Sequence, residues 1–249
     1  MNIAIFAADR VGRDVVQFFK EESFVPCITV LDDNDPKKFN GEIRKAVTSP
    51  LVFGSGELDR PEILEQFRNA RLDLIILAWW PYLLRQPLMG IPRLGCLNFH
   101  PSLLPHDRGK HPNFWSLVEA SPFGVSLHFI DDGIDSGDVA FQRPIAKSWE
   151  DTGGTLYETA QREIVDLFRE NFPAILRGEI PRKRQDLSHG TMHLGRQLEA
   201  ASRLDLNKSY VARDLLNLLR ARTFPPHPAA YFEEDGHEYE VRVEIRKRK

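Results

Sequence analysis

The side chains best suited to chemistry lie in the segment LNFHPSLLP, residues 97–105. Asn98 and His100 end an apolar run and are two residues apart, so in a β-strand both side chains point to the same face. Pro101 follows them and would end the strand. An amide and an imidazole are costly to bury unless they bind a partner. The pair therefore indicates either a ligand site or a satisfied polar pair at a strand end.

A second polar segment, DDGIDSGD, lies between two predicted strands. It carries four aspartates: Asp131, Asp132, Asp135 and Asp138. If this loop reaches the same edge of the sheet, one of its carboxylates can orient the imidazole of His100 or raise its pKa. Asn98 would then donate to an oxyanion, and the three groups would suit acyl transfer without a protein nucleophile. The alternative is a solvent-exposed turn, which acidic glycine-containing loops usually are.

Three other kinds of site find little support in the sequence. Ser102 lacks the G-x-S-x-G turn of a serine hydrolase and is more typical of a turn or a helix cap. His106, His111 and His128 form no H-x-x-x-H pair, so we expect no metal site. The first strand-to-helix turn, AADRVG, has one glycine where a dinucleotide fingerprint needs three. Arg10 in that turn remains a candidate for holding a phosphate.

The composition limits the classes of protein that are possible. The chain has 249 residues, of which 42% are hydrophobic and 28% charged, and its net charge is −3. It therefore offers no general positive field for nucleic acid or an anionic membrane. Cys27 and Cys96 sit in apolar runs, which is typical of buried thiols in a reducing compartment. No apolar segment is long enough to span a bilayer, so we expect a cytoplasmic protein without a membrane partner.

Strands and helices alternate along the first part of the chain. Continuous apolar runs over residues 3–8, 24–31 and 72–78 predict strands that are buried on both faces. Helical spacing of apolar residues predicts helices over 12–22 and 58–69. We therefore expect a Rossmann-like, doubly wound α/β fold with a mostly parallel sheet, in which ligands bind beyond the carboxyl ends of the strands.

The sequence pattern of residues 112–176 predicts a helix over 112–120 and strands over 124–130 and 139–145. It also predicts a long helix over 156–176 that starts after Asp151 and Thr152.

The chain divides into three parts. Residues 1–180 form the main domain, the polar residues 181–207 a linker, and residues 208–249 a helix followed by a β-hairpin around Asp235 and Gly236. A helix and a hairpin are too small to fold alone, so this appendix must pack on the main domain or on another subunit.

The segments LNFHPSLLPHDRG and GVSLHFIDDGIDSGDV together resemble the signature of the folate-dependent formyltransferases. That family includes the glycinamide ribonucleotide, methionyl-tRNA and sugar-nucleotide N-formyltransferases, and the resemblance covers most of residues 1–180. It implies that Asn98, His100 and Asp135 are catalytic and that N10-formyltetrahydrofolate is the formyl donor, without a metal. The implied pterin pocket, formed largely by backbone groups, consists of Trp80, Pro81, Tyr82, Leu83, Leu84, Asp132, Gly133 and Ile134.

The resemblance also implies a reaction. An amine attacks the formyl carbon, Asn98 stabilises the developing oxyanion, His100 handles the proton, and Asp135 orients His100.

The acceptor must be inferred from the C-terminal part. Residues 215–245 resemble the start of the C-terminal domain of the methionyl-tRNA enzyme, but they end after a hairpin where that family continues into a barrel, and a basic surplus for tRNA is missing. The turn AADRVG also differs from the glycine-rich phosphate loop of the purine-pathway enzyme. A catalytic domain with a short tail is similar to the sugar N-formyltransferases, which modify nucleotide-linked 4-amino-4,6-dideoxy sugars for surface polysaccharide such as the lipopolysaccharide O-antigen.

Under this resemblance we expect a dTDP-linked sugar, with GDP as the alternative nucleotide, and a homodimer. The expected substrate contacts are a stack on the base by Phe224 and Tyr231 and binding of the pyrophosphate by Arg10, Arg108 and Lys110. The alternatives within the family are the methionyl-tRNA and glycinamide ribonucleotide activities. Outside it, the alternatives are an inactive folate- or nucleotide-binding protein and a hydrolase that releases formate.

Overall fold

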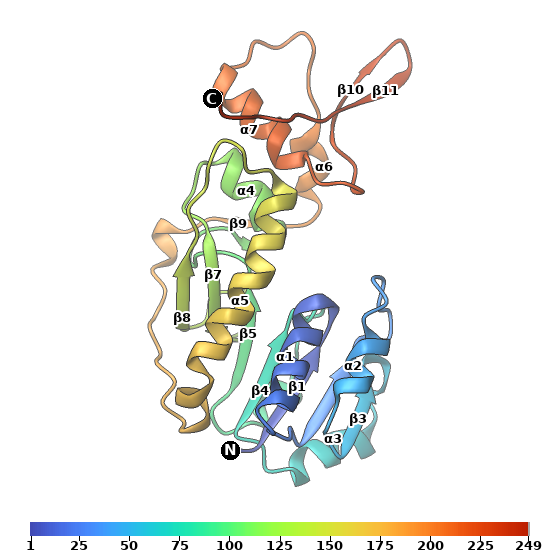
Figure 1. Cartoon of the computed structure of the whole chain (residues 1–249), viewed down its shortest axis with the longest axis vertical. Coiled ribbons are helices and arrows are strands. Elements are labelled where there is room, and N and C mark those ends of the chain that lie inside the picture. Colours follow the sequence, from blue (N-terminus) through green and yellow to red (C-terminus); the bar gives the residue numbers. More distant parts are fainter. Residues whose placement is uncertain (249) are drawn as a thin grey trace.

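The computed structural model describes residues 1–248 and is built around a seven-stranded sheet with the order β3-β2-β1-β4-β5-β7-β8 (Figure 1). From β3 to β5 the neighbouring strands are parallel, whereas β7 and β8 are antiparallel to their neighbours. The strands are β1 (Ile3–Ala7), β2 (Ile28–Leu31), β3 (Leu51–Gly54), β4 (Leu74–Ala78), β5 (Cys96–His100), β7 (Gly124–Phe129) and β8 (Val139–Pro144). The predicted Rossmann-like, mostly parallel α/β fold is confirmed.

Helices cover both faces of this sheet. One face packs on α1 (Asp9–Glu21), α2 (Asn40–Ala46) and α5 (Gly153–Leu176), and the other on α3 (Pro61–Asn69). Side chains of β1 alternate between the two cores, as a strand requires: Ile3 and Ile5 face one core, and Ala4 and Phe6 face the other. Both faces are therefore apolar, which explains the continuous apolar runs of the inner strands.

The sequence did not predict α2 and β3. The strand β3 has only four residues and lies at the edge of the sheet, so its apolar run of Leu51, Val52 and Phe53 is too short to predict a strand. The strand β2 also begins at Ile28, later than the predicted residue 24. Pro26 lies just before it and has no N–H group to donate to a sheet ladder.

Residues 181–207, the predicted linker, run back along the main domain. β9 (Met192–His193) pairs with β6 (Arg108–Gly109), and Lys183 forms a bridge to Val139. α6 (Gln197–Ser202) follows, and three short 3₁₀ helices complete the connections at Ser55–Glu57, Leu88–Gly90 and Leu187–His189. The segment is thus packed against the main domain instead of forming a free connection.

The C-terminal unit consists of α7 (Ala212–Arg222) and the hairpin of β10 (Ala230–Glu234) and β11 (His237–Val241). The hairpin turns at Asp235 and Gly236, both with positive φ, as the sequence predicts. In Figure 1 the unit lies beyond the carboxyl ends of the parallel strands, next to α4 (Pro112–Val118) and the start of α5. The last residue of the predicted appendix, Lys249, lies outside the described residues.

Two glycines let the C-terminal unit approach α5 closely. A Cβ atom on Gly153 would lie 2.1 Å from the carbonyl oxygen of Ala221, and one on Gly154 would lie 3.0 Å from the ring of Phe224. The side chain of Asn113 from α4 donates to the carbonyl of Gly153 at 2.8 Å. The first turn of α5 therefore fixes the position of the end of α7.

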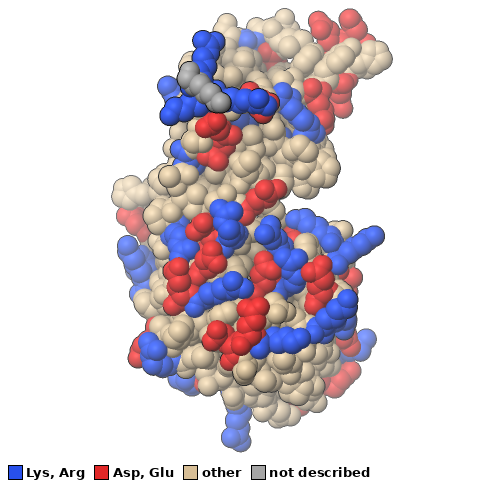
Figure 2. Space-filling view, in the orientation of Figure 1, with Lys and Arg blue, Asp and Glu red and all other residues tan. Residues whose placement is uncertain are grey.

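The face in Figure 2 carries acidic and basic side chains side by side over the main body, and a notch separates this body from the C-terminal unit. Within residues 1–248, no helix combines the length and apolar character needed to cross a bilayer.

Candidate active site

The end of β5 holds the two side chains singled out by the sequence. β5 is paired on both sides, with β4 and with β7, so its position is fixed. Asn98 and His100 both line one cavity, as their spacing predicts. Across the ladder, Asn98 is directly opposite His128 of β7, and its amide Nδ2 lies 3.1 Å from His128 Nε2.

Asp135 is the aspartate of the DDGIDSGD loop that reaches this pair. Its carboxylate oxygens lie 3.5 Å from His100 Nδ1 and 3.4 Å from His128 Nε2. The residue has a φ of 47°, a left-handed conformation, and the backbone N–H of Gly109 donates to its carboxylate at 2.9 Å. Gln185, from the segment predicted as a linker, donates to the carbonyls of Asp135 and Gly137 and so holds the loop in place.

The protonation states of the buried groups follow from these contacts. Burial alone would raise the pKa of Asp135, but the imidazoles of His100 and His128 and the N–H of Gly109 outweigh it and hold that pKa well below its usual range. Burial also lowers the pKa of His100 below its ordinary 6.5, against the opposing effects of Asp135 and the carbonyl of Asp107. A carboxylate beside a neutral imidazole is the state favoured at neutral pH.

His128 is a functional candidate that the sequence did not identify beyond a hydrogen-bonded histidine. It is 1% exposed, and its Nδ1 donates to the carbonyl of Phe129 at 2.9 Å. In the neutral ring, Nε2 is then the acceptor for the amide of Asn98, which fixes the orientation of that amide. The donor atoms of His100, His128 and Asp135 lie within 4.8 Å of one another, a spacing that a metal site would also show.

The cavity is large, with a volume of about 1210 Å³, and it lies between the sheet edge and the C-terminal unit. A site for one small ligand usually occupies about 300–1,000 Å³, so there is room for two ligands. Every residue predicted for the pterin pocket lines this cavity, and together they make up the pterin wall: Trp80, Pro81, Tyr82, Leu83, Leu84, Asp132, Gly133 and Ile134.

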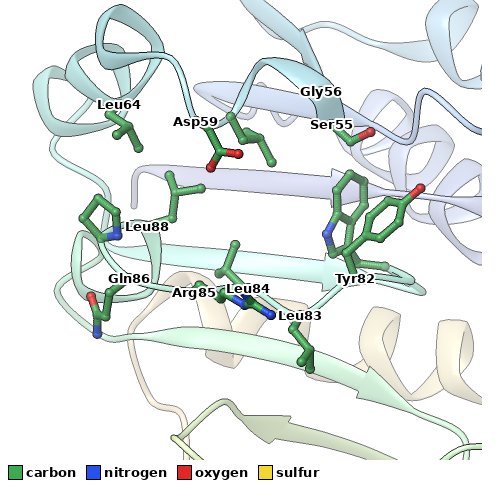
Figure 3. A pocket seen from close by; sticks show the side chains of 13 residues that line it. Ser55, Gly56, Asp59, Leu64, Tyr82, Leu83, Leu84, Arg85, Gln86 and Leu88 are labelled. Carbon is green, nitrogen blue, oxygen red and sulfur yellow. The ribbon is translucent and has the colours of Figure 1, made fainter.

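A smaller groove of about 520 Å³ adjoins this wall (Figure 3). It lies between the segment from Ser55 to Asp59 and the loop of residues 81–88, and Leu84 and Leu88 border it. Tyr82 and Arg85 line both the groove and the large cavity. The loop of residues 81–88 is thus accessible from two sides.

The five predicted substrate contacts divide into two groups. Lys110 and Phe224 line the cavity, whereas Arg10, Arg108 and Tyr231 are not part of its wall. Arg10 lies on the outer side of α1 beside Asp14, with a nitrogen–oxygen distance of 3.7 Å. Arg108 belongs to β6, which pairs with β9, and Tyr231 forms a bridge to Arg203. The structure thus does not bring these three to the site.

A hydrogen-bonded network in the cavity wall was not predicted from the sequence. Lys37 Nζ lies 2.7 Å from Asp9 Oδ2 and 3.1 Å from the hydroxyl of Tyr157, which also accepts from Trp79 Nε1 at 3.1 Å. These four residues line the cavity. They come from two helices and two loops that are far apart in sequence, so no local pattern could have identified the network.

Comparison with protein families gives two matches. Residues 12–170 match the family described as "Formyl transferase", and residues 197–247 match the "N-formyltransferase dimerization C-terminal domain".

Solved structures with the same fold cover 80% to 99% of the chain. A 4-N formyltransferase from Francisella tularensis shares 23% identity over 99% of this chain and 98% of its own, with a TM-score of 0.82. The formyltransferase PseJ from Anoxybacillus kamchatkensis was solved in complex with UDP-4,6-dideoxy-4-formamido-L-AltNAc and tetrahydrofolate. It shares 26% identity over 80% of this chain and 89% of its own, with a TM-score of 0.60. An N-formyltransferase from Helicobacter canadensis, in complex with folinic acid and dTDP-3-aminofucose, shares 15% sequence identity over 95% of this chain and 85% of its own, with a TM-score of 0.73.

Proposed function

The chain belongs to the formyl transferase family, and we propose that it transfers the formyl group of N10-formyltetrahydrofolate to the amino group of a nucleotide-linked 4-amino-4,6-dideoxy sugar. The observation that carries this proposal is the meeting of Asn98, His100 and Asp135 at the wall of one cavity with room for two ligands. An amide donor beside an imidazole paired with a carboxylate suits attack of an amine on a formyl carbon.

Asn98 acts on the oxygen of the formyl group. As the amine nitrogen bonds to the formyl carbon, negative charge develops on that oxygen, and an N–H of the Asn98 amide donates to it. The contact with His128 holds the amide before the reaction begins, so little reorganisation is needed. Breaking of the bond between the formyl carbon and N10 then releases tetrahydrofolate.

His100 accepts the proton that the amine loses. Nε2 donates to the carbonyl oxygen of Asp107 at 3.2 Å, because a carbonyl only accepts, and the amine would take the place of this contact. Once it does, a neutral ring that carries its proton on Nδ1, 3.5 Å from the Asp135 carboxylate, presents the lone pair of Nε2 as the base. The carboxylate of Asp135 stabilises the imidazolium that forms, and the proton is then available for N10 of the leaving folate.

The pterin wall fits a flat ring system. Tyr82, Leu83 and Ile134 are 44%, 73% and 38% exposed, and all three line the cavity. A ring placed against these side chains would remove their apolar surface from water, which is favourable. The folate supplies the activated formyl group. The chain supplies the pocket, the oxyanion donor and the base.

The acceptor is proposed from what the related proteins bind. PseJ was solved with a UDP-linked formamido sugar, and the Helicobacter canadensis enzyme with a dTDP-linked amino sugar. We extend this chemistry to the present chain, with a dTDP-linked sugar as the first candidate and a role in surface polysaccharide synthesis in the cytoplasm. The match of residues 197–247 to a dimerization domain supports a homodimer.

The acceptor is tested by incubating the protein with N10-formyltetrahydrofolate and dTDP-, UDP- and GDP-linked 4-amino-4,6-dideoxy sugars. Mass spectrometry should show addition of one formyl group to at least one sugar. His100→Ala protein, checked for its fold by circular dichroism, is the control and should give no product at matched times. Formylation of initiator tRNA or glycinamide ribonucleotide instead of every sugar would overturn the proposed acceptor.

A further inference from the structure

Arg222, the last residue of α7, has a buried guanidinium that is only partly satisfied within the described residues. Its side chain is 8% exposed and lines the large cavity, and its Nε has no hydrogen-bond partner among residues 1–248. The nearest carboxylate is that of Glu199, at 3.9 Å, and this side chain is 68% exposed. A buried guanidinium normally has several charged or polar partners, so Arg222 is poised to bind an anion.

The neighbouring arginine on the same helix shows what a structural role looks like. Arg220 Nη1 donates to the carbonyls of Ser148 and Asp151 at 2.5 and 3.2 Å, and its Nε donates to Asn217 at 3.0 Å. Its guanidinium also lies 4.7 Å from the ring of Trp149. Arg220 therefore fastens α7 to the start of α5, whereas Arg222 turns to the cavity.

Other basic groups lie on the same wall. His111 and His227 line the cavity with Arg222. Burial lowers the pKa of each, together with the positive charges of Lys110 and Arg222 for His111 and of Lys37 and Arg222 for His227, so both rings are neutral at neutral pH and offer N–H donors. Lys110 lies next to His111 on the rim. The basic wall, defined as Arg222, His111, His227 and Lys110, is formed by other segments of the chain than the pterin wall. The charged groups that act on Arg222 are Glu199, Glu240 and Arg242.

Aromatic rings adjoin the basic wall on one side. The ring of Phe224 lies 4.6 Å from that of His227 and 5.1 Å from that of Tyr157. Both Phe224 and Tyr157 line the cavity. A cationic surface next to aromatic rings matches the chemistry of a nucleotide, which combines negatively charged phosphates with a flat base.

We infer that Arg222 binds the diphosphate of the nucleotide-linked acceptor, with His111, His227 and Lys110 completing the basic wall. This inference rests on the proposed function and names the phosphate-binding part of the same site. It assigns the diphosphate to the C-terminal unit, because the expected contacts Arg10 and Arg108 lie away from the cavity. A guanidinium can donate two parallel N–H bonds to a phosphate, which a lysine cannot.

Calorimetric titration of thymidine diphosphate and of folinic acid into Arg222→Gln protein tests the inference. Loss of a charge-assisted contact should weaken diphosphate binding by about 10- to 100-fold. Folinic acid should bind as it does to the unchanged protein, because Arg222 is not part of the pterin wall. Arg222→Lys should weaken the binding of thymidine diphosphate by a smaller factor. Arg213→Gln, a substitution of an exposed residue on the same helix, is the matched control and should change the affinity for neither ligand.

The outcomes separate this inference from the proposed function. If the unchanged protein formylates nucleotide sugars and R222Q binds thymidine diphosphate equally well, the inference alone is overturned. If the R222Q and R222K proteins both lose the binding of folinic acid as well, Arg222 supports the fold and the inference also fails. If the unchanged protein binds folinic acid but none of dTDP, UDP and GDP, the nucleotide-linked acceptor is contradicted together with the inference.

Discussion

At the scale of single residues, Asn98 and His100 do different work at the same strand end, so their loss should affect different measurable quantities. Asn98→Ala should lower kcat by about 10²- to 10³-fold, because one oxyanion donor is removed, with little change in KM for the folate. Steady-state kinetics with the preferred acceptor gives both values. Asn69→Ala, an exposed asparagine of α3, serves as control. A kcat for Asn98→Ala within twofold of the unchanged enzyme would contradict the role.

The pH dependence of the rate reports the protonation state of His100. Because burial holds its pKa below 6.5, the ring is neutral at neutral pH, and the rate should fall only when the pH drops through that lower pKa. Asp135 raises the pKa of His100, so Asp135→Asn should move this acid limb to still lower pH and reduce the maximal rate. The measurement is kcat/KM against pH for both proteins. An acid limb that moves to higher pH in the variant would contradict the pairing.

The sequence predicted Asn98, His100 and the aspartate loop because each is marked by a local pattern, a polar pair after an apolar strand or a turn-rich acidic loop. Selecting Asp135 required the resemblance to a family, and the structure adds its contacts with His100, His128 and Gly109. His128 and Lys37 could not be predicted, since their roles depend on a strand pairing and on helices that meet only in the folded chain.

At the scale of elements, the contact between α5 and α7 depends on Gly153. Gly153→Ala would place a Cβ 2.1 Å from a backbone oxygen, so the element must shift, and we expect a loss of about 1–3 kcal/mol in the free energy of unfolding. Denaturant unfolding of the two proteins measures it. Gly41→Ala in α2, where a Cβ meets no atom within 4 Å, is the matched control and should not destabilise. Equal stability of both variants would contradict this packing.

The elements that the sequence predicted best are those with a strong apolar period, namely β1, β4, β5 and α5. The edge strand β3 and the helix α2 were missed, because a short, half-exposed element has a weak pattern. The segment 181–207 has no regular period either, although β9 and Gln185 give it a definite place. Its order comes from partners in the main domain, which the local sequence does not reveal.

At the scale of the whole molecule, the C-terminal unit contributes Ala221, Arg222, Phe224, His227 and Pro228 to the wall of the cavity. The same unit matches a dimerization domain, so we expect a homodimer. Light scattering coupled to size exclusion should give about twice the chain mass of 28.6 kDa. A mass of one chain over the full range of working concentrations would contradict the dimer and leave the cavity unaffected.

The central claim is that the formyl group passes directly to an amine bound in this cavity. A single-turnover experiment with N10-formyltetrahydrofolate labelled in its formyl carbon, in the presence of the preferred nucleotide-linked amino sugar, tests it most directly. The account predicts label in the N-formyl sugar for the unchanged enzyme and unreacted folate for His100→Ala. Label released as free formate, with or without the sugar, would show a hydrolase and contradict the account.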